Sequence, residues 1–124
     1  MKRSTLLQRY EAAPGDPLRP TVTPLYQTAT FRLDDAEGHG EYDYTRSGNP
    51  TRDVLQNQLA RLEEAEHAFA FASGMAALDA VFSLVPAGGV ILAGADLYGG
   101  TFRHLERVSA ARGVTAAYVD TTDL

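Results

Sequence analysis

The sequence contains no cysteine and no tryptophan, and Lys2 is its only lysine. Without cysteine the chain can form no disulfide framework, no thiolate metal site and no cysteine nucleophile. It also lacks an apolar run long enough to span a membrane, and its first residues lack the apolar core of a signal peptide. These absences predict a cytoplasmic protein with no membrane partner.

Basic charge is also scarce, because eleven Lys and Arg residues face sixteen Asp and Glu residues. The resulting net charge of −5 argues against a nucleic acid or an anionic membrane as the partner. His39, His67 and His104 share no metal-ligand spacing, so we expect them to face solvent and predict no metal site. An anionic ligand would therefore have to be held by local features of the chain.

Residues 68–85 are the most informative stretch. Small and aromatic residues alternate over 68–72, which predicts a short buried strand. Ser73 and Gly74 interrupt this period, and from Met75 the spacing becomes helical. Asp79 and Ser83 are the only polar residues of this helix, so we expect it to be buried on most sides. Its expected apolar face consists of Met75, Leu78, Phe82 and Val85.

The turn between this strand and this helix is a candidate anion site. Free backbone N–H groups at a helix start, next to a glycine that allows close approach, suit a phosphate group. The alternative is that Ser73 is only an N-cap and Gly74 only a turn residue. Taken alone, this stretch favours the alternative.

The rest of the chain divides into an arm and an α/β region. Residues 1–24 carry four of the six prolines, which favours an extended arm. Asn49 and Pro50 are typical of a helix start, and this helix should end around 63–66. We therefore predict an extended arm and loop over 1–48 and an α/β region over 49–124.

The second half of the α/β region repeats the strand–helix alternation. Apolar runs predict strands at 90–93 and 114–119, with a helix from about Thr101 between them and Gly113 at its end. We expect Phe102, Leu105 and Val108 on the core side of that helix. The order β-α-β-α-β with short loops predicts a parallel sheet, whose ligands bind at the carboxyl ends of the strands.

Two further stretches carry groups that suit a cofactor. In residues 42–51, Arg46 could fork onto a phosphate with the Tyr44 hydroxyl beside it; the alternative is a loop that caps the next helix. Tyr98 precedes two glycines at the end of a strand and could lie on a flat cofactor; the alternative is an aromatic packing residue. Each alternative is the commoner case for its stretch alone.

Together, YDYTRSGNPTR, FASGMAAL and DLYGGTFR resemble the Cys/Met-metabolism family of pyridoxal-phosphate enzymes in order and spacing. The resemblance covers the chain from about Pro24 onward. It implies the first part of the large α/β domain of a fold-type I enzyme, with pyridoxal 5′-phosphate (PLP) as cofactor. The cofactor-binding residues it implies are Tyr44, Arg46, Ser73, Gly74, Met75 and Tyr98.

In the family, Tyr44 and Arg46 would reach the phosphate in the site of a neighbouring subunit, while Gly74 and Met75 would offer backbone N–H groups to it. Tyr98 would stack on the pyridine ring. The resemblance thus implies a homodimer or homotetramer with shared sites. Its substrate would be a sulfur amino acid or an activated homoserine.

The implied activity is C–S bond chemistry on cystathionine-like amino acids, with cystathionine β- or γ-lyase first and γ-synthase as the alternative. The Schiff-base lysine of the family lies further along than Leu124, so this chain has no catalytic residue of its own. We therefore expect an N-terminal portion that is inactive alone. A second hypothesis is a non-catalytic partner that lends Tyr44 and Arg46 to a full-length homologue.

Overall fold

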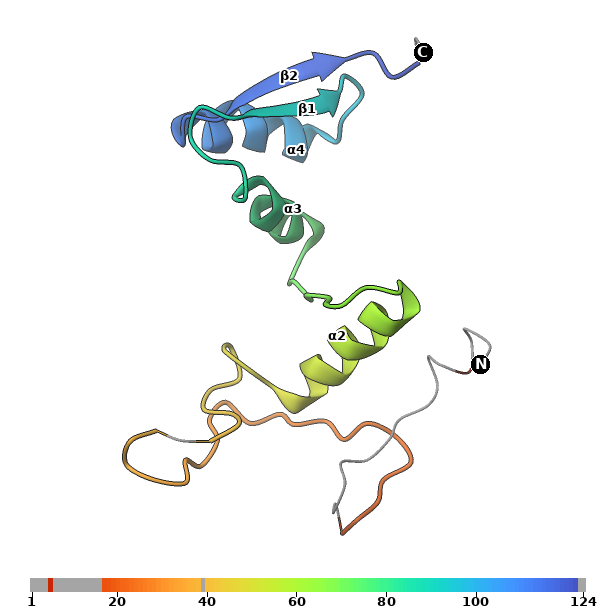
Figure 1. Ribbon diagram of the computed structural model, residues 1–124, viewed down its shortest axis with the longest axis vertical. Coiled ribbons are helices and arrows are strands. Elements are labelled where there is room, and N and C mark those ends of the chain that lie inside the picture. The colour runs from red at the N-terminus through yellow and green to blue at the C-terminus, as the bar shows by residue number, and fades with distance from the viewer. Residues whose placement is uncertain (1–4, 6–16, 39, 123–124) are drawn as a thin grey trace. The chain divides into compact units, whose positions relative to one another are not determined.

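The computed structural model describes residue 5, residues 17–38 and residues 40–122. His39, Lys2 and most of the predicted arm therefore lie outside the described residues. The chain forms two compact units, Met1–Ala70 and Phe71–Leu124, with one labelled helix in the first and a small α/β arrangement in the second (Figure 1). The helix at Pro50 thus belongs to the same unit as the arm.

Helix α2 is the regular element of the first unit and spans Pro50–Leu62. Asn49 adopts an extended backbone and its side chain accepts a hydrogen bond from the Thr51 N–H, while Pro50 stands in the first turn. Asp53 in the first turn and Arg61 in the last complement the helix dipole. The predicted helix, its cap and its end are confirmed.

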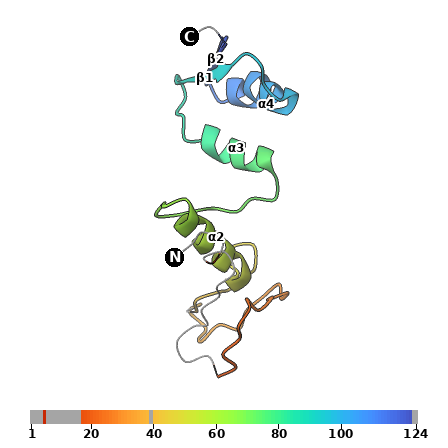
Figure 2. The same ribbon diagram turned by 90° about the vertical axis from the view of Figure 1, so that its right-hand side faces the viewer.

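The second unit contains two helices and two strands. Helix α3 spans Gly74–Phe82, strand β1 Val90–Gly94, helix α4 Gly99–His104, and strand β2 Thr115–Val119. The strands pair in parallel from Val90↔Thr115 to Gly94↔Val119. Figure 2 shows them nearly edge-on, with α4 on one side of the sheet. The predicted strands and the parallel pairing are confirmed.

Helix α4 continues into a π-helical segment, η1, over Leu105–Ser109. The chain then turns at Gly113, whose φ of +78° favours glycine at this helix end, as expected. The buried residues of the α4–η1 helix are Thr101, Leu105 and Ser109, four residues apart. Val108 is 40% exposed, so its predicted core position is wrong. Phe102 is 50% exposed, but its ring lies on the sheet side as expected, with its centre 5.5 Å from that of Tyr118 in β2. The buried residues are spaced by four, which is longer than the roughly 3.6 residues per turn of an α-helix, and the wider i→i+5 turn of η1 accommodates this spacing.

The predicted strand at 68–72 is not formed. Phe69 is 74% exposed. The Ala70 N–H donates a hydrogen bond to a side chain, Oε1 of Gln56 at 2.9 Å, and not to a neighbouring strand. A strand exists only when it pairs with a neighbour, and the described sheet contains only β1 and β2. Residues 68–72 thus have the side-chain alternation of a strand, but no described strand pairs with them.

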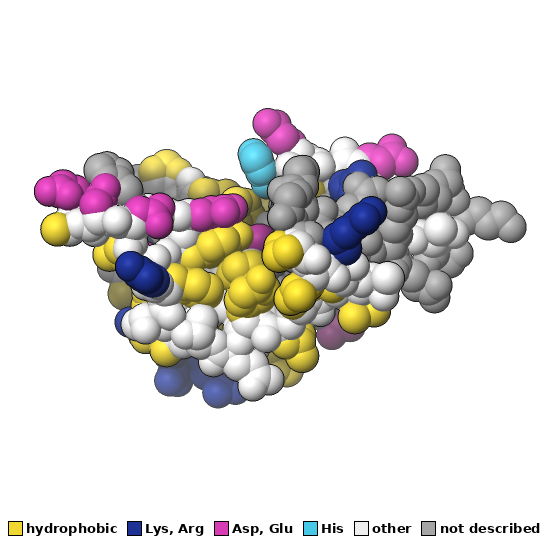
Figure 3. All heavy atoms as spheres, turned by 90° about the horizontal axis from the view of Figure 1, so that it is seen from below, with side chains coloured by type: hydrophobic (Ala, Val, Ile, Leu, Met, Phe, Trp, Pro, Cys, Tyr) yellow, Lys and Arg dark blue, Asp and Glu magenta, His cyan; other side chains and the backbone are white. Residues whose placement is uncertain are grey.

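The expected burial of α3 is also wrong, since none of its residues is buried. The buried apolar residues of the described chain are Ala60, Leu105 and Val114, whereas Leu84 and Leu92 are largely exposed. Figure 3 shows hydrophobic side chains at the surface on one face, beside acidic and basic ones. The described chain therefore has more apolar surface than it covers itself.

Candidate functional site

A hollow of about 410 Å³ lies where helices α3 and α4 begin. Both helices direct their N-terminal ends to it, so one hollow receives backbone N–H groups from α3 and an aromatic ring from α4. Four of the six predicted cofactor residues are thereby brought together. The lining residues are Ser73, Gly74, Met75, Leu78, Tyr98 and Thr101.

The start of α3 combines the two roles that the sequence left open. Ser73 is the N-cap, and its Oγ accepts a hydrogen bond from the Ala76 N–H at 3.1 Å. The N–H groups of Gly74 and Met75 have no hydrogen-bond partner among the described residues. A Cβ added to Gly74 would meet no atom within 4 Å, so a ligand can approach its backbone closely. Capping by Ser73 therefore leaves two amides for an anion.

Tyr98 stands at the N-cap position of α4, and its side chain is not packed in a core, since the residue is 74% exposed. Its carbonyl accepts the Thr101 N–H at 2.8 Å, which fixes the backbone. The ring lies against Gly100, where an added Cβ would collide with Cε1 and lie 3.0 Å from Cδ1 of Tyr98. The glycine therefore makes room for a ring that is open to a flat ligand.

Tyr44 and Arg46 lie in a tight turn of the first unit. The Ser47 and Gly48 N–H groups both donate to the Tyr44 carbonyl at 3.0 Å, and Thr30 and Tyr44 form an antiparallel bridge. The Arg46 guanidinium lies 4.8 Å from the centre of the Tyr44 ring. The turn thus presents a cation and a phenol side by side, two groups that can both donate to a phosphate.

Two residues that the sequence analysis did not select as site residues, Asn49 and Arg52, hold this turn. The Arg52 guanidinium donates to the carbonyls of Thr45 at 2.8 Å and Ser47 at 3.1 Å. The buried Asn49 donates from Nδ2 to the Tyr26 carbonyl at 3.0 Å and to Thr45 Oγ1 at 2.8 Å, besides capping α2. The sequence could have pointed to both residues, since Asn49 and Arg52 belong to the same motif as Tyr44 and Arg46, YDYTRSGNPTR. The turn therefore both caps α2 and presents the candidate phosphate ligands.

His104 does not face solvent, so that prediction is wrong. Its side chain is 11% exposed, and its Nε2 lies 2.8 Å from Oδ1 of Asp79. The hydrogen bond with His104, helped by Arg112, holds the pKa of the Asp79 carboxyl below its usual value. A polar residue of α3 attracts the histidine to the helix interface, which spacing alone did not reveal. His67 is exposed, as predicted.

The described residues contain no group of three or more His, Asp or Glu side chains that could hold a metal ion. Within the same part of the chain, no helix is long and apolar enough to cross a membrane.

The family model for Cys/Met-metabolism PLP-dependent enzymes matches residues 4–124 of the chain. The chain belongs to this family. The chloroplastic cystathionine beta-lyases of Mimosa pudica and Arabidopsis thaliana are 50% and 54% identical to it, over 98% and 88% of this chain. They are matched over only 26% and 24% of their own lengths, so the chain spans about a quarter of these relatives.

A solved relative within the family shows the fold. The crystal structure of cystathionine gamma-lyase from Lactobacillus plantarum complexed with L-serine is 42% identical and superimposes with a TM-score of 0.85. The match covers 99% of this chain and 32% of that one. The chain therefore has the α/β fold of the corresponding first part of a fold-type I PLP-dependent enzyme, as the resemblance implied.

The hollow fits the cofactor of this family. PLP combines a phosphate with a flat pyridine ring, and the hollow offers two unpaired amides at a helix start and an exposed tyrosine ring. The described residues contain no lysine, and Lys2 is the only lysine of the sequence. What they offer the cofactor is therefore non-covalent.

Proposed function

We propose that the chain is the N-terminal, cofactor-binding portion of a PLP-dependent enzyme that cleaves the C–S bond of cystathionine-like amino acids. The observation that carries the proposal is the shared hollow of Ser73, Gly74, Met75 and Tyr98. The identity of 50% to a cystathionine beta-lyase over 98% of the chain supports β-lyase activity as the first choice. Cystathionine γ-lyase comes next, and γ-synthase is the alternative.

Each proposed ligand has one task. The Gly74 and Met75 amides donate to phosphate oxygens, with the helix dipole adding favourable potential. The Tyr98 ring lies on the pyridine ring and fixes its plane. The bound cofactor would supply an electron sink for the carbanion formed when the substrate loses its α-proton, which leads to elimination or replacement of the sulfur group.

The activity is tested on the full-length protein that carries this sequence. Supplied with L-cystathionine, a β-lyase releases pyruvate and a γ-lyase releases 2-oxobutyrate, so the keto acid identifies the bond that is cleaved. Formation of cystathionine from cysteine and an activated homoserine would identify the γ-synthase instead. A protein that turns over no sulfur amino acid and no activated homoserine would contradict the proposal.

The assembly proposed with this function is a homodimer or homotetramer in which Tyr44 and Arg46 complete the site of a neighbouring subunit. The pairing of the exposed Arg46 guanidinium with the half-buried Tyr44 ring supports it, because the guanidinium is available to a ligand outside its own turn. Complementation tests it: a subunit with Arg46→Ala and one with Tyr98→Ala should regain activity when mixed. Failure of every mixed pair would contradict site sharing. Residence in the cytoplasm remains a prediction, to be tested by cell fractionation.

The same two residues carry the second candidate function, a non-catalytic partner of a full-length homologue. Co-purification with such a homologue is expected, and the homologue's activity should fall when the 124-residue chain carries Arg46→Ala. Unchanged activity with that variant would exclude the partner role.

A further inference from the structure

Asp79 is the only charged residue of helix α3, and it lies on the face that meets helix α4. Met75, Asp79 and Phe82 are four and three residues apart, so their side chains share this face. Thr101 and His104 share a face of α4 in the same way. Two polar contacts join the faces: Thr101 Oγ1 lies 3.8 Å from the sulfur of Met75, and His104 Nε2 lies 2.8 Å from Asp79 Oδ1.

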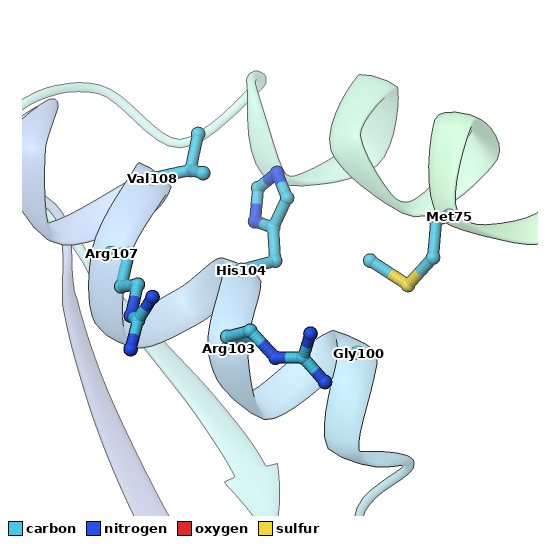
Figure 4. Close-up of a pocket in the computed structure, with 6 residues that line it drawn as sticks. All are labelled: Met75, Gly100, Arg103, His104, Arg107 and Val108. Carbon is cyan, nitrogen blue, oxygen red and sulfur yellow. The ribbon is translucent and has the colours of Figure 1, made fainter.

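The His104 ring is held on three sides. An ionised carboxylate can only accept, so Nε2 donates to Asp79. Nδ1 lies 3.3 Å from Oγ of the buried Ser109, which is five residues further along the π-helical segment. The Phe82 ring lies against the imidazole with ring centres 5.4 Å apart. In Figure 4 the His104 ring projects from α4 toward the ribbon of α3. The π-helical turn thus places Ser109 where it can hold the ring.

Asp79 accepts a further hydrogen bond from the Arg112 guanidinium at 3.1 Å. One carboxylate therefore ties α3 to the junction of α4 and η1 at His104 and to the turn that follows the helix at Arg112. We call Asp79, His104, Ser109 and Arg112 the Asp79 clamp. Because no residue of α3 is buried, apolar packing holds this helix weakly, and the clamp carries a correspondingly larger share of the helix–helix contact.

The position of the clamp relates it to the hollow. Asp79 is one helical turn beyond Met75, and His104 is one turn beyond Thr101, while Met75 and Thr101 both line the hollow. The free amides lie on α3 and the tyrosine ring on α4, so one ligand molecule can use both only at a fixed separation of the two helix ends. A shift of about 1 Å between them would break one of the two contacts.

We propose that the Asp79 clamp positions α3 against α4, so that the amides of Gly74 and Met75 and the ring of Tyr98 bind the same cofactor molecule. Its residues are positioning residues that touch no part of the ligand themselves. The link to the cofactor rests on the proposed function, whereas the fixing of the helices does not.

The helix arrangement can be measured without any cofactor. Because the sequence has no cysteine, the double variant Met75→Cys/Thr101→Cys contains one thiol pair, and its rate of intramolecular disulfide formation reports how often the two helix ends meet. Adding His104→Ala should slow this rate about tenfold, as loss of a charge-assisted hydrogen bond implies. The matched control is Ser83→Ala, whose hydroxyl bonds only within its own turn, to the Ala80 carbonyl, and the rate should not change.

The link to the cofactor is tested by comparing three ligands on the 124-residue chain: PLP, pyridoxal and inorganic phosphate. In His104→Ala the dissociation constant for PLP should rise about tenfold, whereas those for pyridoxal and phosphate should change less than about twofold, because each uses one helix. Asp79→Asn keeps an oxygen that accepts from His104, so its dissociation constant for PLP should lie between those of the unaltered chain and His104→Ala.

Equal weakening of all three ligands, or an unchanged disulfide rate in His104→Ala, would overturn the clamp. If the unaltered chain binds no PLP while His104→Ala still slows the disulfide, the link between the clamp and cofactor binding fails and the fixing of the two helices stands.

Discussion

The two units position their candidate cofactor residues by different physical means. In Met1–Ala70, Tyr44 and Arg46 lie in a turn that is held by hydrogen bonds from the side chains of Asn49 and Arg52. In Phe71–Leu124, the hollow is formed by the starts of two helices, so regular backbone geometry presents its groups. A loop held by a few side chains should be more sensitive to their removal than a helix start.

The two N-caps provide the sharpest test of this difference. Asn49 is buried and bonds to Tyr26 and Thr45 in addition to capping α2, so Asn49→Ala should cost about 2–3 kcal/mol. Ser73 is exposed and only caps α3, so Ser73→Ala should cost about 0.5–1 kcal/mol. Native-state hydrogen exchange of the α2 and α3 amides measures both. Equal costs would contradict the comparison.

In the second unit the ring of Tyr98 can be tested through ligand binding. A Cβ at Gly100 would displace the Tyr98 ring, so Gly100→Ala should weaken PLP binding about fivefold, on the order of 1 kcal/mol of stacking. Gly99→Ala is the matched control, because a Cβ there meets nothing within 4 Å. Isothermal titration of both variants gives the comparison. Equal affinities would show that the ring is not a ligand.

These tests rest on features that differ in how far the sequence reveals them. The caps at Asn49 and Ser73, the positive-φ turn at Gly113 and the two apolar strands are set by local chemistry, and all were predicted correctly. Four of the residues that line the hollow, Ser73, Gly74, Met75 and Tyr98, were also selected from the sequence, because a strand–turn–helix pattern places them at helix starts.

What the sequence did not reveal depends on partners distant along the chain. The alternation at 68–72 indicates a strand, but pairing requires a neighbouring strand that the described residues do not provide. The burial of His104 depends on Asp79, 25 residues earlier, and on Ser109. Ser109 lies across a π-helical turn that no sequence pattern predicted. Periodicity describes one element at a time and therefore misses both.

Within the first unit, Arg52→Lys should loosen the Tyr44–Arg46 turn by about 0.5–1 kcal/mol. A lysine ammonium cannot fork onto the carbonyls of Thr45 and Ser47 as the guanidinium does. Faster hydrogen exchange at the Ser47 and Gly48 amides is the expected sign. Arg61→Lys on the same helix serves as the control, and an equal response in both variants would show that the fork has no role in the turn.

The smallest expected effect is a pH dependence in the second unit. The pKa of Asp79 is lowered, first by the hydrogen bond with His104 and also by Arg112. A lowered folded-state pKa adds stability above the unfolded value, and this stability is lost as the pH falls below about 4. Urea midpoints from pH 6 to pH 2 should therefore fall less steeply in Asp79→Asn.

Asp120, whose pKa is lowered by hydrogen bonds with Thr122, contributes to the same acid loss independently. The double variant Asp79→Asn/Asp120→Asn should show the flattest profile. A profile unchanged by Asp79→Asn would mean that its carboxylate does not stabilise the unit.

The central claim is that the starts of α3 and α4 bind the cofactor, with the phosphate on the amides and the ring on Tyr98. Amide NMR of the 124-residue chain during titration with PLP tests it directly. Two charge-assisted hydrogen bonds of about 1.5–3 kcal/mol each and ~1 kcal/mol of stacking correspond to a dissociation constant of roughly 10 µM to 1 mM. The account predicts reversible shifts of the Gly74, Met75 and Tyr98 signals in this range, and of Gly74 and Met75 alone with inorganic phosphate. Unmoved signals at Gly74 and Met75, or a stoichiometric covalent adduct that survives dialysis, would contradict it.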